Sequence, residues 1–259
     1  MLIERIVAPN PGPMTLTGTN TYLVGDGAGN LAVIDPGPED LPRHLDAILA
    51  AAHALGRITT VVVTHRHLDH LPLAIPLCKE TGARLAGHPD LPGVEQPLGQ
   101  NAPTFNGMVA LHTPGHTRDS VCLWNASEAT LFTGDLVLGS GTAVLDDAPG
   151  ALTDYMSSLE QLFGLRPRTI YPGHGPVVPD GAAKLTEYLE HRRLRLQQVL
   201  DALGHHGPST VAELAAAIYT DVAPSMLPMA GRNVRANLEL LLSESRIERL
   251  DGDRWQLMR

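Results

Sequence analysis

The segment THRHLDH, residues 64–70, places three histidines and one aspartate within seven positions. A random arrangement of this composition would contain the pattern only roughly two times in a thousand, so composition alone does not explain it. Imidazole and carboxylate groups are ligands for zinc, and also for iron and manganese. In an extended backbone His65, His67 and Asp69 would point to one side and His70 to the other. One short loop could therefore address two metal ions.

Further histidines and aspartates follow other apolar, β-type runs. Taken singly, each is readily explained as a loop residue, an Asx-turn residue or a helix N-cap. Four residues cannot complete two coordination shells, however, and strand ends at one edge of a sheet bring their side chains together. We therefore interpret these residues as part of the same site: Asp35 in VIDPG, His116 in HTPGHT, Asp135 in LFTGDL and His174 in YPGHGP.

The other histidines lack this context, and we interpret them as surface or packing residues. They are His44, His53, His88, His112, His191, His205 and His206.

The elements that must position these groups form a mixed α/β domain. Alternating β-branched runs predict strands, and apolar residues at helical spacing that end in glycine predict helices. We expect a hairpin over 20–35 and strands over 58–65, 83–87, 107–113, 120–125, 129–134 and 168–173. We expect helices over 41–56, 71–83, 152–164 and 181–204.

The character of the chain changes near HHGPST, residues 205–210. Beyond it, two helical patterns are followed by two β-type runs around DGD, an order typical of a winged helix with the hairpin as its wing. We therefore expect a catalytic domain over 1–204 and a winged-helix-like module over 205–259.

Composition limits the partners of the chain. The net charge is −9, and residues 180–259 carry 10 basic and 11 acidic side chains, a net of −1. This balance argues against binding of duplex DNA by electrostatic attraction. The N-terminal segment MLIERIVAPN has no apolar run typical of a signal peptide or membrane span, so we expect a cytoplasmic protein without membrane association. The sequence leaves the oligomeric state open, a homodimer included.

The motifs resemble the metallo-beta-lactamase superfamily, whose five motifs are matched in order by Asp35, THRHLDH, His116, Asp135 and His174. Within it the chain resembles the beta-lactamase-like protein 2 family over nearly its whole length. That narrower likeness depends on NPGPMTLTGTNTYLVG, GDLVLGSGT, DYMSSLEQL, IYPGHGPV and HRRLRLQQVL. Many superfamily members follow the first histidine motif with Gly-Gly, whereas this chain has Leu71 and Pro72.

The resemblance implies an αββα sandwich with two divalent metal ions at one edge. It implies one ion on His65, His67 and His116, and the other on Asp69, His70 and His174. Asp135 would bridge the two ions, and Asp35 would orient a ligating histidine from outside the coordination shell. We expect zinc, with iron and manganese as alternatives.

Two metal ions in such a site lower the pKa of a bridging water towards neutrality and stabilise an oxyanion on the substrate. The nucleophile would then be a metal-bridging hydroxide. Asp69, beside both ions, is the candidate catalytic residue that accepts a proton from the hydroxide or orients it.

The substrate has two main candidates. The first, and the one we expect, is metal-dependent hydrolysis of phosphodiesters in single-stranded RNA, because the narrower family includes an endoribonuclease. Five C-terminal arginines could contact phosphates, although they could equally form surface ion pairs with Glu187, Glu190 and Glu239. Aromatic residues make up only 4% of the chain, which gives little support to base stacking. The arginines are Arg192, Arg193, Arg195, Arg232 and Arg235.

The alternative is hydrolysis of a thioester or another small acyl ester, as in glyoxalase II-like members of the superfamily. The acidic catalytic half and the scarcity of aromatic residues suit that reaction at least as well. A true beta-lactamase fits less well because no export signal is found. A third interpretation, a sensor with a DNA-binding or dimerising winged helix, conflicts with the charge of the C-terminal segment.

Overall fold

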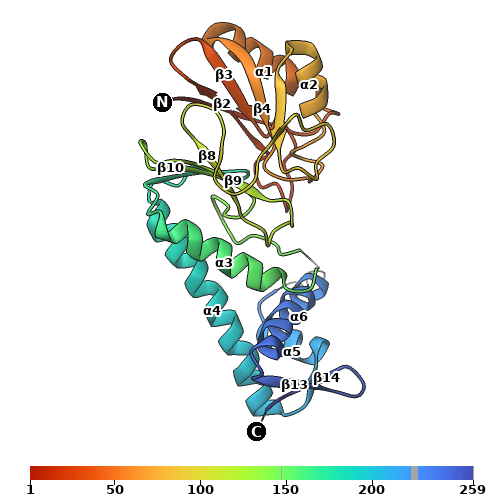
Figure 1. Ribbon diagram of the computed structural model, residues 1–259. Helices are drawn as coiled ribbons and strands as arrows, with labels where there is room; N and C mark the ends of the chain where they lie inside the picture. Colours follow the sequence, from red (N-terminus) through yellow and green to blue (C-terminus); the bar gives the residue numbers. More distant parts are fainter. Residues whose placement is uncertain (147, 223–226, 259) are drawn as a thin grey trace.

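Two β-sheets packed face to face form the centre of the larger domain (Figure 1). The computed structural model describes residues 1–146, 148–222 and 227–258. The first sheet has the strand order β1-β2-β3-β4-β5-β6 and is antiparallel from β1 to β3 and parallel from β3 to β6. Its strands are β1 (Leu2–Val7), β2 (Asn20–Gly25), β3 (Asn30–Ile34), β4 (Arg57–Val62), β5 (Arg84–Gly87) and β6 (Gln96–Pro97).

Helices α1 (Pro42–Leu55) and α2 (Ala74–Thr81) connect the parallel pairs β3–β4 and β4–β5. Pro42 lies in the first turn of α1, where its missing N–H costs nothing. Gly82 ends α2 in the left-handed conformation, as the sequence predicts for a helix followed by glycine.

The second sheet has the order β11-β10-β9-β8-β7, and only its β10–β11 pair is parallel. Helix α3 (Ala151–Gly164) connects that pair. The strands are β7 (Ala102–Pro103), β8 (Val109–His112), β9 (Val121–Asn125), β10 (Thr130–Gly134) and β11 (Thr169–Pro172).

Three apolar layers hold the sandwich together. Val24, Val62 and Phe132 belong to the layer between the sheets, whereas Leu23 and Val61, their neighbours in sequence, pack outward against α1 and α2. This alternation follows from the two-residue period of strands that are buried on both faces. The helices α3 and α4 (Gly181–His206) cover the outer face of the second sheet (Figure 1). The predicted αββα sandwich is confirmed.

The C-terminal module has its own core and a three-stranded sheet in the order β12-β14-β13. Its first short helix begins with a capping box, in which Thr210 and Glu213 each bond to the other's backbone N–H. The helix–helix–hairpin order that the sequence predicts is confirmed. The elements are β12 (Ser209–Thr210), α5 (Val211–Ile218), α6 (Leu227–Ser243), β13 (Ile247–Leu250) and β14 (Arg254–Leu257).

Helix α4 (Gly181–His206) joins the module to the sandwich. Leu185 and Leu189 in its first half pack into the core of the second sheet, whereas Val199 and Leu203 pack into the core of the module. The boundary that we expect after residue 204 therefore falls in the last turn of a helix that both cores share.

Four short or edge strands, β1, β6, β7 and β12, are absent from the sequence-based expectation. β1 is exposed at most positions, so its apolar pattern is weak. Among the described residues, no helix is both long and apolar enough to cross a membrane.

Candidate metal centre

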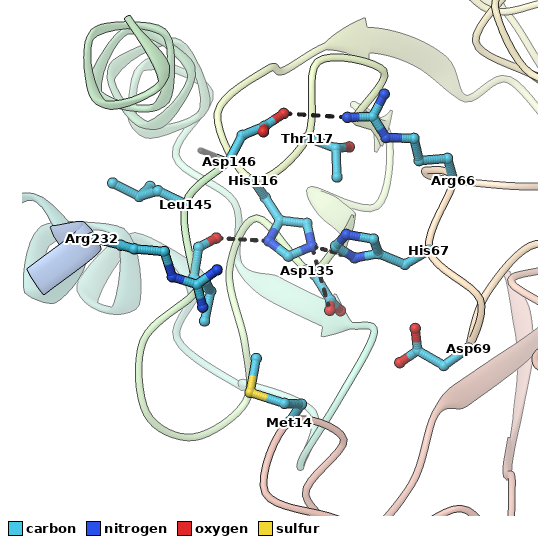
Figure 2. A pocket seen from close by; sticks show the side chains of 11 residues that line it. Met14, Arg66, His67, Asp69, His116, Thr117, Asp135, Leu145, Asp146 and Arg232 are labelled. Atoms are coloured by element: carbon cyan, nitrogen blue, oxygen red, sulfur yellow. Dashed lines mark hydrogen bonds and ion pairs between the residues drawn. The ribbon is translucent and has the colours of Figure 1, made fainter. Parts of the chain in front are cut away.

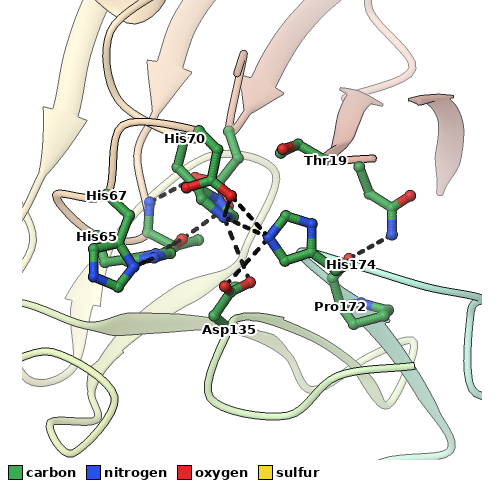
Figure 3. Close-up of polar contacts among 12 residues, drawn as sticks. Thr19, His65, His67, His70, Asp135, Pro172 and His174 are labelled. Carbon is green, nitrogen blue, oxygen red and sulfur yellow. Dashed lines mark hydrogen bonds and ion pairs between the residues drawn. The ribbon is translucent and has the colours of Figure 1, made fainter. Parts of the chain in front are cut away.

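All the predicted ligand residues lie in loops that directly follow strands, at one edge of the sandwich. Asp35 follows β3, the histidine-rich loop follows β4, His116 follows β8, Asp135 follows β10 and His174 follows β11. Figure 3 shows His65 and His67 to the left of Asp135 and His174 to its right. The structure thus brings together every side chain that the sequence places in the site.

The first group of side chains consists of His65, His67, His116 and Asp135. His67 Nδ1 lies 3.0 Å from His65 Nε2 and 3.0 Å from His116 Nε2. Asp135 Oδ2 lies 3.7 Å from His116 Nε2. Three nitrogens and one oxygen therefore converge on a single point, with one ligand atom of each residue within 4.8 Å of the others.

The second group consists of Asp69, His70 and His174. His174 Nε2 lies 3.1 Å from Asp69 Oδ2 and 3.2 Å from His70 Nε2. Asp135 reaches this group as well, because its Oδ1 is 3.4 Å from His70 Nε2 and its Oδ2 is 3.3 Å from His174 Nε2. Asp135 thus contacts both groups, as a residue that bridges two cations must.

The loop after β4 is not extended throughout, and this corrects one step of the sequence-based reasoning. His70 and Leu71 both donate their backbone N–H to the carbonyl of His67, at 3.0 Å each. The resulting turn brings His70 back towards the site and separates Asp69 from His65 and His67. Strand periodicity correctly places His65 and His67 together and wrongly places His70 on the opposite side.

Asp35 and Thr64 orient one histidine of each group. Asp35 Oδ2 accepts from Thr64 Oγ1 at 2.8 Å and lies 2.9 Å from His70 Nδ1. Because the Thr64 hydroxyl donates to Asp35, it accepts from His65 Nδ1 at 3.0 Å. With Nδ1 protonated in both His65 and His70, Nε2 of each ring faces the site.

Two backbone carbonyls orient other histidines in the same way. His116 Nδ1 lies 2.8 Å from the carbonyl of Val144, and His174 Nδ1 lies 3.2 Å from the carbonyl of Gly18. A carbonyl can only accept, so Nδ1 carries the proton and Nε2 faces the site. Side-chain patterns give no signal for such carbonyls. Thr64, the hydroxyl residue just before the first histidine, could have been noticed in the sequence.

The electrostatics of the two groups differ. Burial lowers the pKa of His65 and of His67, with the neighbouring histidines adding to the effect. Burial alone would also lower the pKa of His70 and His174. The carboxylates of Asp135 and Asp35 raise the pKa of His70 by more than burial lowers it, and those of Asp135 and Asp69 do the same for His174. The pKa of His70 is therefore well above its usual value, and that of His174 is raised to about 9. His65 and His67 are therefore neutral imidazoles, whereas His70 and His174 hold protons that a cation must displace.

The donor set fits divalent metal ions. Unprotonated imidazole nitrogens within 3.2 Å of one another repel unless a proton or a cation lies between them. Within the described part of the chain, Asp135 Oδ1 is buried without a hydrogen bond, although His70 Nε2 is 3.4 Å away. Buried carboxylate oxygens are normally satisfied, so this atom is suited to a metal ligand.

Two glycines allow the strand ends to approach one another. A Cβ atom at Gly134 would overlap the side chain of Thr64, and one at Gly173 would overlap Asp135 and come within 2.8 Å of His70 Cε1. Any larger residue at either position would push apart groups that must converge on one point.

A pocket of about 310 Å³ opens beside the first group (Figure 2). Arg66 lines it and lies 3.5 Å from Asp119 and 3.3 Å from Asp146. The aliphatic side chains of Met14, Val144 and Leu145 form another part of its wall, and Arg232 reaches it from α6.

The five C-terminal arginines do not form a common surface at this pocket. Only Arg232 lines it. Arg192 is buried, donates to the carbonyl of Ala143 at 2.6 Å and lies over the Tyr155 ring at 4.8 Å, so the interpretation of Arg192 as a phosphate contact is wrong. Arg193 lies 3.6 Å from Glu160, Arg195 lies over the Tyr219 ring at 4.5 Å, and Arg235 lies 3.5 Å from Asp253.

Known proteins resemble the chain in sequence and in structure. Residues 14–99 and 88–174 match the family described as the metallo-beta-lactamase superfamily, and residues 210–255 match the beta-lactamase associated winged helix domain. The chain is 35% identical to the beta-lactamase-like protein 2 homolog of Drosophila melanogaster over 95% of this chain and 89% of that protein. It is 36% identical to the atrochrysone carboxyl ACP thioesterase of Aspergillus fumigatus over 84% of this chain and 73% of that protein.

A solved metallo-beta-lactamase family protein from Thermus thermophilus has the same fold. It superposes with a TM-score of 0.77 at 23% identity over 99% of this chain and 98% of that one. Together with the strand-end cluster of histidines and aspartates, these matches show that the chain belongs to the metallo-beta-lactamase superfamily, as a hydrolase with a metal-binding site and a C-terminal winged-helix domain.

Proposed function

We propose that this hydrolase cleaves a thioester or another small acyl ester at a dinuclear zinc centre. The observation that carries the proposal is the apolar part of the pocket lining, which consists of Met14, Val144 and Leu145; Met14 is 51% exposed. Such a surface suits an acyl chain. None of the described residues that line the pocket is a Phe, Tyr or Trp on which a base could stack. The Aspergillus relative, whose name describes a thioesterase, supports the same reaction class.

The leaving group also favours a thioester. A thiol has a pKa of about 8.5, so a thiolate departs without help from a protonated side chain. An alkoxide, which leaves from a phosphodiester or from an oxygen ester, needs more help. The described lining of the pocket includes neither a lysine nor a histidine outside the two metal-binding groups that could supply a proton.

Two zinc ions at these groups would supply Lewis acidity and would lower the pKa of a water molecule. Asp69 is placed to hold the proton of that water, because its side chain lines the pocket and is 27% exposed. Burial would raise the pKa of Asp69, but His174 and His70 lower it below its usual value. Asp69 is therefore an ionised acceptor at neutral pH.

Zinc is proposed because the two groups offer five imidazoles and two carboxylates. Imidazole suits zinc and iron, whereas manganese prefers a set richer in oxygen. Separate loading with each metal tests this choice.

Cleavage of single-stranded RNA is the second candidate. It is favoured by the guanidinium groups of Arg66 and Arg232 at the pocket, because guanidinium binds phosphate in a bidentate manner. The other four arginines considered for phosphate contact do not line the pocket, which leaves this candidate less supported.

A parallel assay separates the two candidates. The zinc-, iron- and manganese-loaded protein is given S-lactoylglutathione, S-hexanoyl-N-acetylcysteamine and a fluorescent single-stranded RNA. His67→Ala removes a metal-binding side chain, and His53→Ala, at an exposed position in the last turn of α1, is the matched control.

We expect thioester turnover that is lost in His67→Ala and kept in His53→Ala. Turnover of RNA alone, lost in His67→Ala, would establish the second candidate instead. RNA cleavage that persists in His67→Ala indicates a contaminating nuclease.

A further inference from the structure

The winged-helix module contributes a charged side chain to the pocket of the catalytic domain. Arg232, Ala236 and Leu240 follow one another at four-residue spacing on α6, so they lie on one face of this helix. Ala236 and Leu240 pack against the hydrophobic core of the second sheet and its helices. This packing fixes the helix against the catalytic domain, and Arg232, at its pocket end, lines the pocket.

The pocket is lined by metal-binding side chains in one part and by Leu145 and Arg232 in the part near α6. Figure 2 shows Leu145 and Arg232 on one side of His116, and Arg66 and His67 on the other. A substrate held along the aliphatic side would therefore have its reacting carbon near the metal-binding groups and its far end near Arg232.

The two arginines of the pocket differ in their surroundings. Arg66 lies within 3.5 Å of the carboxylates of both Asp119 and Asp146, and Asp119 is buried. These contacts tie Arg66 to the loops that flank His116. Arg232 lines the pocket on the other side of His116, the side on which Leu145 lies.

We propose that the pocket selects acyl groups that end in a carboxylate, and that Arg232 binds this carboxylate. The proposal rests on the proposed acyl hydrolysis. A planar guanidinium offers two parallel N–H groups to a carboxylate, which fixes the direction of the chain as well as its charge. The winged helix thereby serves as the part of the substrate site that determines specificity.

The test compares two thioesters that differ only at the far end of the acyl chain: S-adipoyl- and S-hexanoyl-N-acetylcysteamine. For the wild-type protein we expect a higher kcat/KM with the adipoyl compound. Arg232→Gln should lower that preference by about 10- to 100-fold, since hydrogen bonds to charged groups contribute this much. Arg232→Lys should retain part of it, and Arg232→Glu should favour the hexanoyl compound.

Arg235→Gln is the matched control. Arg235 is an exposed arginine on the same helix, 3.5 Å from Asp253, and it does not line the metal-site pocket. Its replacement should leave the preference unchanged. The preference is a ratio within one variant, so a partial loss of folded protein does not alter it.

A binding measurement keeps this inference separate from the proposed reaction. In thioether analogues of the two compounds, a CH2 group replaces the thioester carbonyl, and their affinities are measured by calorimetry without turnover. Tighter binding of the carboxylate analogue that is lost in Arg232→Gln supports the inference even if neither thioester is hydrolysed. Equal reduction of both substrates by Arg232→Gln, or binding of neither analogue to the wild-type protein, overturns it.

Discussion

Thr64→Val tests how the protein fixes the proton positions of its metal-binding histidines. The Thr64 side chain is buried, donates to Asp35 and accepts from His65 Nδ1. Valine has nearly the same shape but no hydroxyl group. The N–H of His65 would then lose its acceptor in a buried place, which costs about 1 to 3 kcal/mol.

The His65 ring can avoid that cost by moving its proton to Nε2. This proton would occupy the position that a metal ion needs, so metal affinity should fall. Loss of a group that orients a ligand typically lowers metal affinity 10- to 100-fold, or about 1.4 to 2.8 kcal/mol. We expect this loss in the group that contains His65, with a smaller effect on the group that contains His70, which keeps its contact with Asp35.

The assay is competition for zinc with a chromophoric chelator, together with urea unfolding of the metal-free protein. Thr60→Val is the matched control, since Thr60 is a buried threonine on β4, the strand that leads to Thr64, about 13 Å before Thr64 in an extended chain. If Thr64→Val and Thr60→Val both bind two zinc ions within twofold of the wild-type affinity, the hydroxyl does not set the proton position and the reasoning is wrong.

Three further predictions concern other residues of the metal centre and the buried Arg192. Asp69→Asn should lower kcat more than it raises KM, because the amide cannot take up a proton; steady-state kinetics with metal analysis checks this, and unchanged kcat with both metals retained contradicts it. The raised pKa values of His70 and His174 stabilise the metal-free fold below pH 6.5, and this contribution is lost as pH rises through about 9 for His174. Zinc must displace these protons, so lowering the pH from 8 to 6 should release the zinc at Asp69, His70 and His174 first; metal analysis at each pH should find one ion retained, and simultaneous loss of both ions argues against it. Arg192→Leu should lower the free energy of unfolding by about 1 to 3 kcal/mol, because the carbonyl of Ala143 loses a charged donor; urea unfolding that matches wild type contradicts this.

The strands that carry the ligands could be predicted from the sequence because each is a short β-type run that stops at a residue able to ligate metal. His116, Asp135 and His174 indicate a metal site only when they are taken together, because a histidine or aspartate by itself is common in a loop. Their convergence follows from two sheets whose strand ends share an edge, and the resemblance to a known superfamily supplied their division into two groups.

Other parts depend on backbone turns and tertiary contacts that the pattern of side chains does not record. The turn that redirects His70 closes through the backbone of His67, and the carbonyl of Val144 acts on a histidine 28 residues away. Arg192 lies in a stretch whose pattern is typical of an exposed basic helix, yet it is buried over Tyr155. The position of Arg232 at the pocket depends on the packing of α6 against the catalytic domain.

The most direct test of the dinuclear centre is anomalous X-ray diffraction from crystals of the zinc-loaded protein at the zinc absorption edge. We predict two peaks, one surrounded by His65, His67 and His116 and the other by Asp69, His70 and His174, with Asp135 in contact with both. A single peak, or zinc bound away from these side chains, would contradict the assignment of the strand-end cluster as a two-metal site.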